Sequence, residues 1–186
     1  MNLLARWAGY LAIAGGAVMV VMLFLVVITN PATSPAWNLL WAVVASLGAG
    51  VLGLYERTKS AVGRLGRVSA WLSALGALGL LIVAAYAIAT NQLNTDPNAP
   101  PDPLWPFWII TFGAWLGGNV VFAVALIRAR ALSLSGAWLV LAGAVAGVAA
   151  SILGGSNPPP ALFLVFVLFG VGWVMLGYAA TRQEAG

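Results

Sequence analysis

Apolar residues in this chain form six long runs that are separated by shorter polar segments. The hydrocarbon core of a membrane is about 30 Å thick, and a helix needs roughly 20 predominantly apolar residues to cross it. The runs approach that length, and they lack the alternation of apolar and polar positions that a membrane β-strand requires. The pattern therefore predicts an all-α protein, a bundle of six transmembrane helices over residues 8–29, 38–55, 69–90, 107–127, 134–153 and 161–180.

The basic residues give these predicted helices an orientation. The intervening connections alternate between cationic ones and ones that carry no cation, and Asp96 and Asp102 lie in the second kind. Connections rich in Lys and Arg stay on the cytoplasmic side of a membrane. We therefore expect both termini in the cytoplasm, on the same side as all eight cations: Arg6, Arg57, Lys59, Arg64, Arg67, Arg128, Arg130 and Arg182.

The composition indicates that lipid is the solvent of this chain. Apolar residues make up 62% of it and charged residues only 6%, whereas about a quarter of the residues in a soluble domain are charged. We expect a single integral membrane domain over residues 1–186. The net charge of +4 does not indicate a nucleic-acid partner, because the cations are spread over one membrane face instead of being gathered on one element.

The connection 56–68 is the most basic segment of the chain. Its cations, Arg57, Lys59, Arg64 and Arg67, are interleaved with apolar residues. Such a segment can lie on the membrane surface as a short amphipathic helix and contact anionic lipid headgroups. The alternatives are that it only fixes the topology or that it docks a soluble protein.

Groups that carry catalysis or bind metals are scarce. No Asp, Glu, Lys, Arg or His lies inside a predicted span, and the chain has neither His nor Cys. Proton relays and ion coupling within a membrane use ionisable groups, and haem or metal centres need ligands of these types. We therefore expect no enzyme activity, no cofactor and no metal site.

Asn119 is the polar residue that stands out within the spans. A primary amide that faces lipid costs several kcal/mol unless it is hydrogen-bonded, so Asn119 is expected to face the bundle. One interpretation is an interhelical hydrogen bond worth about 0.6 to 2 kcal/mol. The other is that Gly117, Gly118 and Asn119 mark a locally opened helix, whose amide lines an uncharged solute path together with Ser46 and Thr111.

Small and aromatic residues indicate how the helices are arranged. Gly and Ala cover nearly all sides of run 134–153, which predicts that this helix is central. Run 161–180 is expected to face lipid through its aromatic residues. Tryptophans near the start of alternate runs suggest three repeated helical hairpins, although interfacial tryptophans recur in membrane proteins without any repeat. The residues concerned are Phe163, Phe166, Phe169 and Trp173 in the last run, and Trp7, Trp71 and Trp138 at the starts of alternate runs.

The fourth and fifth runs also carry a family resemblance. Residues 118–132 (GNVVFAVALIRARAL) and 136–143 (GAWLVLAG) resemble a pattern of small bacterial integral membrane proteins, the DUF4386-like group. The resemblance implies a polytopic bacterial membrane protein and carries no assigned activity. Seven of the eight basic residues are arginine, which agrees with a GC-rich prokaryotic source.

Together these observations lead to a functional expectation. The chain offers packing surfaces and no reactive group within its spans, so we expect a structural or interaction subunit of an assembly in the bacterial plasma membrane. The expected partners are lipid, with anionic headgroups on the cytoplasmic side, and other protein subunits. The alternative is a small-solute carrier or channel with an uncharged path near Asn119.

Overall fold

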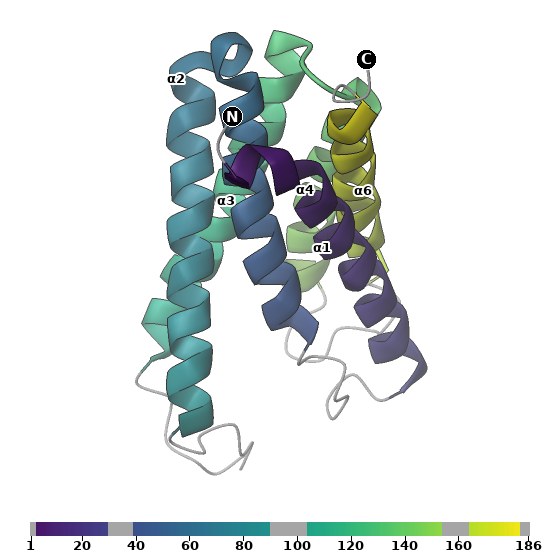
Figure 1. Cartoon of the computed structure of the whole chain (residues 1–186). Coiled ribbons are helices and arrows are strands. Elements are labelled where there is room, and N and C mark those ends of the chain that lie inside the picture. Colours follow the sequence, from purple (N-terminus) through teal and green to yellow (C-terminus); the bar gives the residue numbers. More distant parts are fainter. Residues whose placement is uncertain (1–2, 30–38, 90–103, 154–163, 183–186) are drawn as a thin grey trace.

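A computed structural model describes residues 3–29, 39–89, 104–153 and 164–182. These residues form five α-helices and no strand, which confirms the predicted all-α class (Figure 1). The helices are α1 Leu3–Ile28, α2 Leu39–Ala89, α3 Trp105–Ala129, α4 Leu134–Leu153 and α6 Phe166–Arg182.

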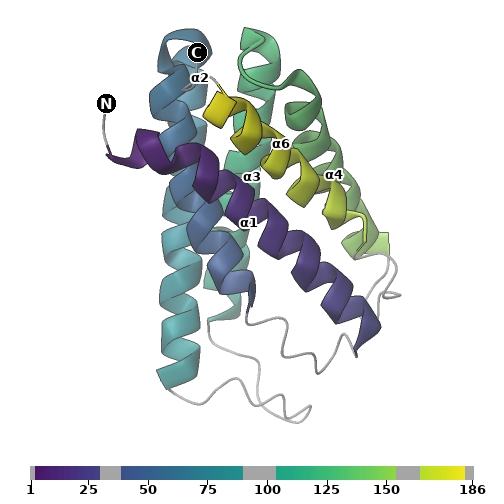
Figure 2. The same cartoon turned by 45° about the vertical axis from the view of Figure 1, so that its right-hand side comes forward.

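The longest helix, α2, folds back on itself at Gly63. This residue has φ 59° and ψ −145°, outside the helical region, in a conformation that glycine adopts without the steric cost of a Cβ atom. The two halves of α2, residues 39–62 and 64–89, run antiparallel and side by side (Figures 1 and 2). They pack closely, because a Cβ atom at Gly48 would lie 2.7 Å from the Cβ of Ala77. The element is therefore a helical hairpin, with its turn in the predicted cytoplasmic connection.

The helices pack in neighbouring pairs. The contacts join α1 to α2 and α6, α3 to α2 and α4, and α4 to α6. Within α2, the first half lies against α1 and the second half against α3, and α6 lies beside both α1 and α4.

Three glycines bring the paired helices into close contact. A Cβ atom at Gly53, Gly118 or Gly172 would collide with backbone atoms of the facing helix. In each pair the facing contacts flank a tryptophan of the first helix, and the exposed fractions of these tryptophans are nearly equal. They are 56% for Trp7, 54% for Trp71 and 53% for Trp138. The facing residues are two positions before and after Trp71 and Trp138, and are shifted by one residue at Trp7, so the three pairs have similar but not identical contacts.

The predicted positions of the last two helices were wrong. Phe169 and Trp173 on α6 are fully buried, so these residues do not face lipid, whereas Phe163 lies outside the described residues. On α4, by contrast, Trp138 and Val145 are exposed, so that helix lies at the side of the bundle. Its glycines leave room for a larger neighbour, since Gly143 faces the backbone of Phe169. Small residues therefore mark where a neighbouring helix approaches and not which helix is central.

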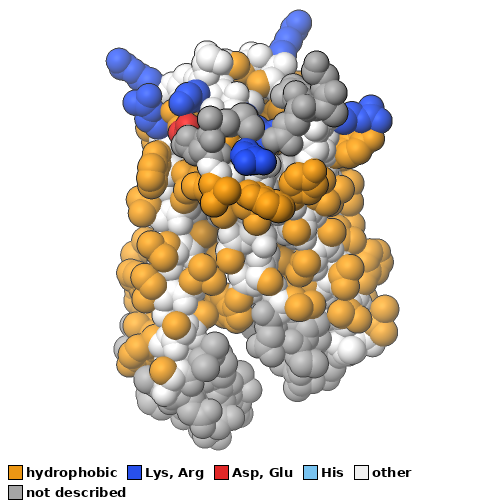
Figure 3. All heavy atoms as spheres, in the orientation of Figure 1, with side chains coloured by type: hydrophobic (Ala, Val, Ile, Leu, Met, Phe, Trp, Pro, Cys, Tyr) orange, Lys and Arg blue, Asp and Glu red, His pale blue; other side chains and the backbone are white. Residues whose placement is uncertain are grey.

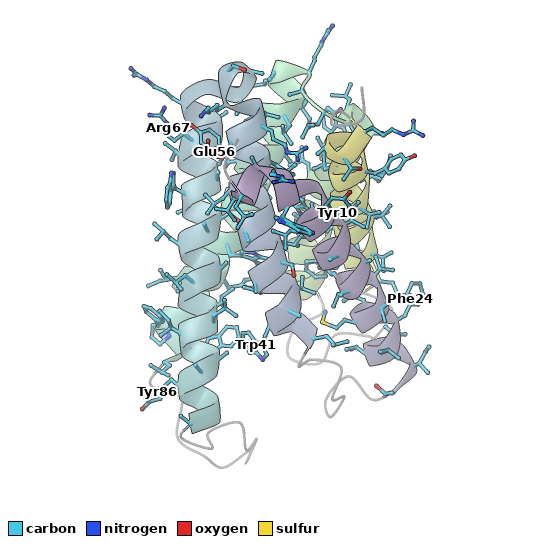
Figure 4. All side chains as sticks on the ribbon, viewed as in Figure 1. Tyr10, Phe24, Trp41, Glu56, Arg67 and Tyr86 are labelled. Carbon is cyan, nitrogen blue, oxygen red and sulfur yellow. The ribbon has the colours of Figure 1, made fainter. Side chains whose placement is uncertain are left out.

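Charged residues gather at one end of the bundle. Figure 3 shows Lys and Arg side chains at the end that also holds the Gly63 turn, above a band of exposed apolar side chains. Glu56 and Arg67 lie at this end and Trp41 and Tyr86 toward the other (Figure 4). The first residues of α1 and the last residues of α6 are also on the charged side (Figure 1).

By length and composition, three helical segments of the described chain can cross a membrane: Leu3–Ile28, Leu39–Tyr86 and Pro106–Ala129. Leu134–Ala149 and Phe166–Arg182 are shorter apolar helices. This criterion supports a membrane protein and does not by itself establish the predicted count of six spans.

We expect Gly118→Ala to destabilise the fold by about 1–3 kcal/mol, because the added methyl group overpacks the contact with the Ser73 backbone. Gly113→Ala is the matched control on the same helix, since a Cβ atom there meets nothing within 4 Å. Unfolding of both variants in mixed detergent micelles measures the difference. Equal stability of the two variants would contradict the close contact.

Candidate functional site

The candidate site is built on the inner face of α3. Thr111, Trp115 and Asn119 follow one another at four-residue spacing and therefore share one side of the helix. All three are buried, and this side lies against the second half of α2. Gly76 on α2 faces the backbone of Trp115, and Gly118 on α3 faces the backbone of Ser73.

This close contact sets up a hydrogen bond between two helices. The Asn119 Nδ2 group donates to Ser73 Oγ at 2.9 Å and to the backbone oxygen of Trp115 at 2.7 Å. A backbone carbonyl can only accept, so the amide nitrogen must face it, and this contact fixes the orientation of the amide. The Oδ1 atom of Asn119 is buried and has no hydrogen-bond partner among the described residues.

Two buried indole groups also lack a hydrogen-bond partner among the described residues. The atoms concerned are Nε1 of Trp115 and Nε1 of Trp173. The two rings lie on either side of Phe169, with centroid distances of 6.1 Å from Trp115 to Phe169 and 6.3 Å from Phe169 to Trp173. Aromatic side chains therefore connect α3 to α6 through the interior. We refer to Ser73, Trp115, Asn119 and Trp173 as the buried polar cluster.

The chemistry of the buried polar cluster is that of neutral hydrogen bonding. It presents two N–H donors and one carbonyl acceptor that are free, and each buried unpaired group costs about 1–3 kcal/mol. None of its four side chains titrates near neutral pH. The cluster can therefore form hydrogen bonds with neutral groups.

The structure places the other two predicted site residues differently. Thr111 shares the inner face of α3, but its Oγ1 donates to the backbone oxygens of Phe107 at 2.8 Å and Trp108 at 3.2 Å in its own helix. Ser46 is half-buried on the first half of α2, against Gly15 of α1. The structure thus brings Thr111 onto the same helix face as Asn119 and leaves Ser46 in a different helix pair.

Sequence reasoning missed Trp115 and Trp173 as members of this site. The signal that could have found them is their position, since tryptophan in a membrane helix is usually near the headgroups. Both residues instead lie well inside their predicted spans. Ser73 could not be singled out, because its role depends on the register between α2 and α3.

Arg57 joins three helices, and its predicted contact with headgroups stays a prediction. Its side chain is half-buried. Nη1 donates to the backbone oxygen of Ala180 on α6 at 2.8 Å, Nη2 to that of Arg6 on α1 at 3.3 Å, and Nε to that of Ala5. Ala180 is in the last turn of α6, where backbone carbonyls have no hydrogen-bond partner within the helix. The Arg57 guanidinium therefore supplies the missing donor for the Ala180 carbonyl.

The other three cations of this connection are exposed. Lys59 forms an ion pair with Glu56 at 3.0 Å. Arg67 donates to the Tyr55 hydroxyl oxygen at 3.0 Å, and this hydrogen bond raises the pKa of Arg67. Arg64 is exposed at the turn beside Gly63. Contact of Lys59, Arg64 and Arg67 with lipid headgroups stays a prediction.

A double-mutant cycle with Asn119→Leu and Ser73→Ala measures the interhelical bond. We expect a coupling of about 0.6–2 kcal/mol in the free energy of unfolding, the range for polar contacts between membrane helices. Asn119→Leu with Ser46→Ala is the matched control, and these effects should add because Ser46 belongs to another helix pair. If the Asn119 and Ser73 effects are strictly additive, the two side chains do not interact.

Comparison of the chain with protein-family models, with curated proteins and with solved structures finds no match. Its function therefore has to be argued from its own residues and from the arrangement of its helices.

Proposed function

We propose that the chain is an integral protein of the bacterial plasma membrane that crosses the bilayer six times, as three helical hairpins. The reversal at Gly63 supports this count, because each half of α2 exceeds the roughly 20 residues that one span requires. With 20 and 17 residues, α4 and α6 fall within the range of spanning lengths, about 17–25 residues.

The distribution of charge supports an orientation with both termini in the cytoplasm. Arg57, Lys59, Arg64 and Arg67 flank the Gly63 turn, Arg128 is in the last turn of α3, and Arg130 directly follows that helix. These segments, the start of α1 and the end of α6 are at the same end of the bundle (Figures 1 and 3). Cationic connections on one side are typical of the cytoplasmic face.

Within this membrane, the proposed role is that of an interaction subunit. The observation that carries it is the outward face of α3, where a Cβ atom at Gly113 or Gly117 would meet nothing within 4 Å. Apart from Gly63 at the turn, every other glycine in the described helices lies against neighbouring atoms. Two glycines four residues apart let a second membrane helix approach closely. The open face thus fits a helix that the described helices of this chain do not supply.

The surroundings of this glycine face fit the same role. Ile109 and Ile110 beside it are exposed by 56% and 66%. At 100° per residue, Gly113 points away from Thr111 and Trp115, so the face lies opposite the buried polar cluster. A partner helix would therefore pack on α3 from the lipid side without touching Asn119.

A carrier of small uncharged solutes is the second candidate function. The specific observation in its favour is the presence of three unpaired hydrogen-bonding atoms in the interior of the bundle. Ser46 lies in another helix pair, and the Thr111 hydroxyl is bound to its own helix. A path would therefore depend on Asn119 and the two indoles, and the purified chain would have to move solute without a partner.

We expect a photo-crosslinking phenylalanine analogue at Ile110 to form one discrete protein adduct in native membranes. Gly117→Ile should abolish the adduct, because the larger side chain fills the face that the partner helix approaches. The matched control is the same analogue at Val145 on α4, which is exposed by 58% and has no glycine face beside it. Lipid adducts alone at both positions would refute the proposed interaction surface.

A further inference from the structure

Close glycine contacts join each neighbouring pair of described helices except α3 and α4. A Cβ atom at Gly16 of α1 would lie 2.4 Å from the backbone oxygen of Gly170 on α6, and one at Gly143 of α4 would lie 2.2 Å from the backbone nitrogen of Phe169 on α6. Contacts of the same kind join α1 to α2 and α2 to α3. The described glycines of α4 face α6, whereas those of α3 face α2 or meet nothing within 4 Å. We refer to the facing sides of α3 and α4 as the α3–α4 seam.

The α3–α4 seam is packed near the charged end of the bundle and loosens toward the other end. The short connection 130–133 joins the two helices at the charged end, and their ribbons are further apart at the opposite end (Figures 1 and 2). Leu116 on α3 and Ala144 on α4 are buried. One turn further from the connection, on the same side of each helix, Phe112 and Val148 are exposed by 36% and 39%. Burial along the seam is therefore lost in the half that is remote from the charges.

Helix α6, in contrast, is anchored on α1. Gly16 faces Gly170 and Gly9 faces Gly177, and in both pairs each glycine is close to the backbone oxygen of the other. Arg57 adds a hydrogen bond to the last turn of α6. Helix α4 packs closely on α6 and is joined to α3 at the charged end. Rotation of α4 about α6 would therefore move the remote half of α4, which no close glycine contact of the described chain holds against α3.

We propose that the α3–α4 seam is a lateral gate, an opening toward the lipid that widens and closes as the remote half of α4 moves against α3. Apolar side chains in a membrane exchange a protein neighbour for a lipid chain at little cost, so a seam without close backbone packing opens more easily than one that has it. An open seam admits lipid chains between Phe112 and Val148, and a closed seam excludes them. The gate belongs to this chain alone and does not depend on the partner helix proposed for the glycine face of α3.

The test is double electron–electron resonance of the full, purified chain in lipid nanodiscs. Because the chain has no Cys, spin labels can be attached to pairs of cysteines introduced at exposed positions. The pairs are Ile109→Cys with Val148→Cys at the remote half of the seam, Arg128→Cys with Leu134→Cys at its charged end, and Val21→Cys with Leu168→Cys on α1 and α6. We expect the distance distribution of the first pair to be about twice as wide as those of the two control pairs, because a hinged helix moves most at its free end.

The anchor of α6 has a test of its own. Arg57→Met removes the hydrogen bonds to α1 and α6 and should widen the distribution of a charged-end pair on these helices, Tyr10→Cys with Tyr178→Cys. Arg64→Met is the matched control, because Arg64 is exposed at the turn, and it should leave that distribution unchanged.

Two outcomes would overturn the gate. One is a distribution for the Ile109 and Val148 pair that is as narrow as those of the control pairs. The other is equal widening at all three pairs, because it would show a loose bundle and not a movement of α4 against α3. Both comparisons use the chain with its native Arg57, so they decide the proposal even if Arg57→Met does not fold. Neither depends on the outcome of crosslinking at Ile110.

Discussion

A hydrocarbon solvent cannot replace a hydrogen bond, and the placement of polar groups in this chain depends on that constraint. The described backbone in the apolar zone is helical, and the described charged side chains are at one end of the bundle. Where a polar side chain is inside, as at Thr111 and Asn119, it bonds to a helix backbone or to another helix. The exceptions among the described residues are Asn119 Oδ1 and the Nε1 atoms of Trp115 and Trp173, which are buried without a hydrogen-bond partner.

Close helix contacts make this placement possible. Because lipid removes most of the hydrophobic drive between helices, packing and hydrogen bonds hold the bundle together. Gly118 brings α3 onto the Ser73 backbone, and the bond between Asn119 and Ser73 forms at that contact. At the charged end, Arg57 adds a second type of link by bonding to backbone oxygens of α1 and α6.

Hydropathy predicted the helical class and the approximate limits of the helices, because the length of an apolar run is set by the bilayer. It could not give the rotation of a helix about its axis. The aromatic residues Phe169 and Trp173 were therefore assigned to lipid although they are buried. The glycines of α4 were read as a sign of a central helix, whereas they accommodate the larger side chains and backbone of α6.

The candidate site was predictable only in part, for a related reason. Asn119 could be recognised because an amide in mid-span is costly. Its partner Ser73 depends on the register of α2 against α3, which follows from the positions of Gly76 and Gly118 once the two helices face each other. The backbone hydrogen bonds of Arg57 could not be predicted, because the sequence does not show that the end of α6 lies within reach of its side chain.

The central claim is that the chain crosses the membrane repeatedly, with its cationic connections on one side. Because the chain has no Cys, single cysteines can be introduced by Ser60→Cys, in the Gly63 connection, and by Asn94→Cys, in the connection outside the described residues. The most direct measurement is labelling of each in intact cells with a membrane-impermeant maleimide. The account predicts that only the cysteine at position 94 is labelled until the cells are opened. Labelling of both positions from the same side would contradict it.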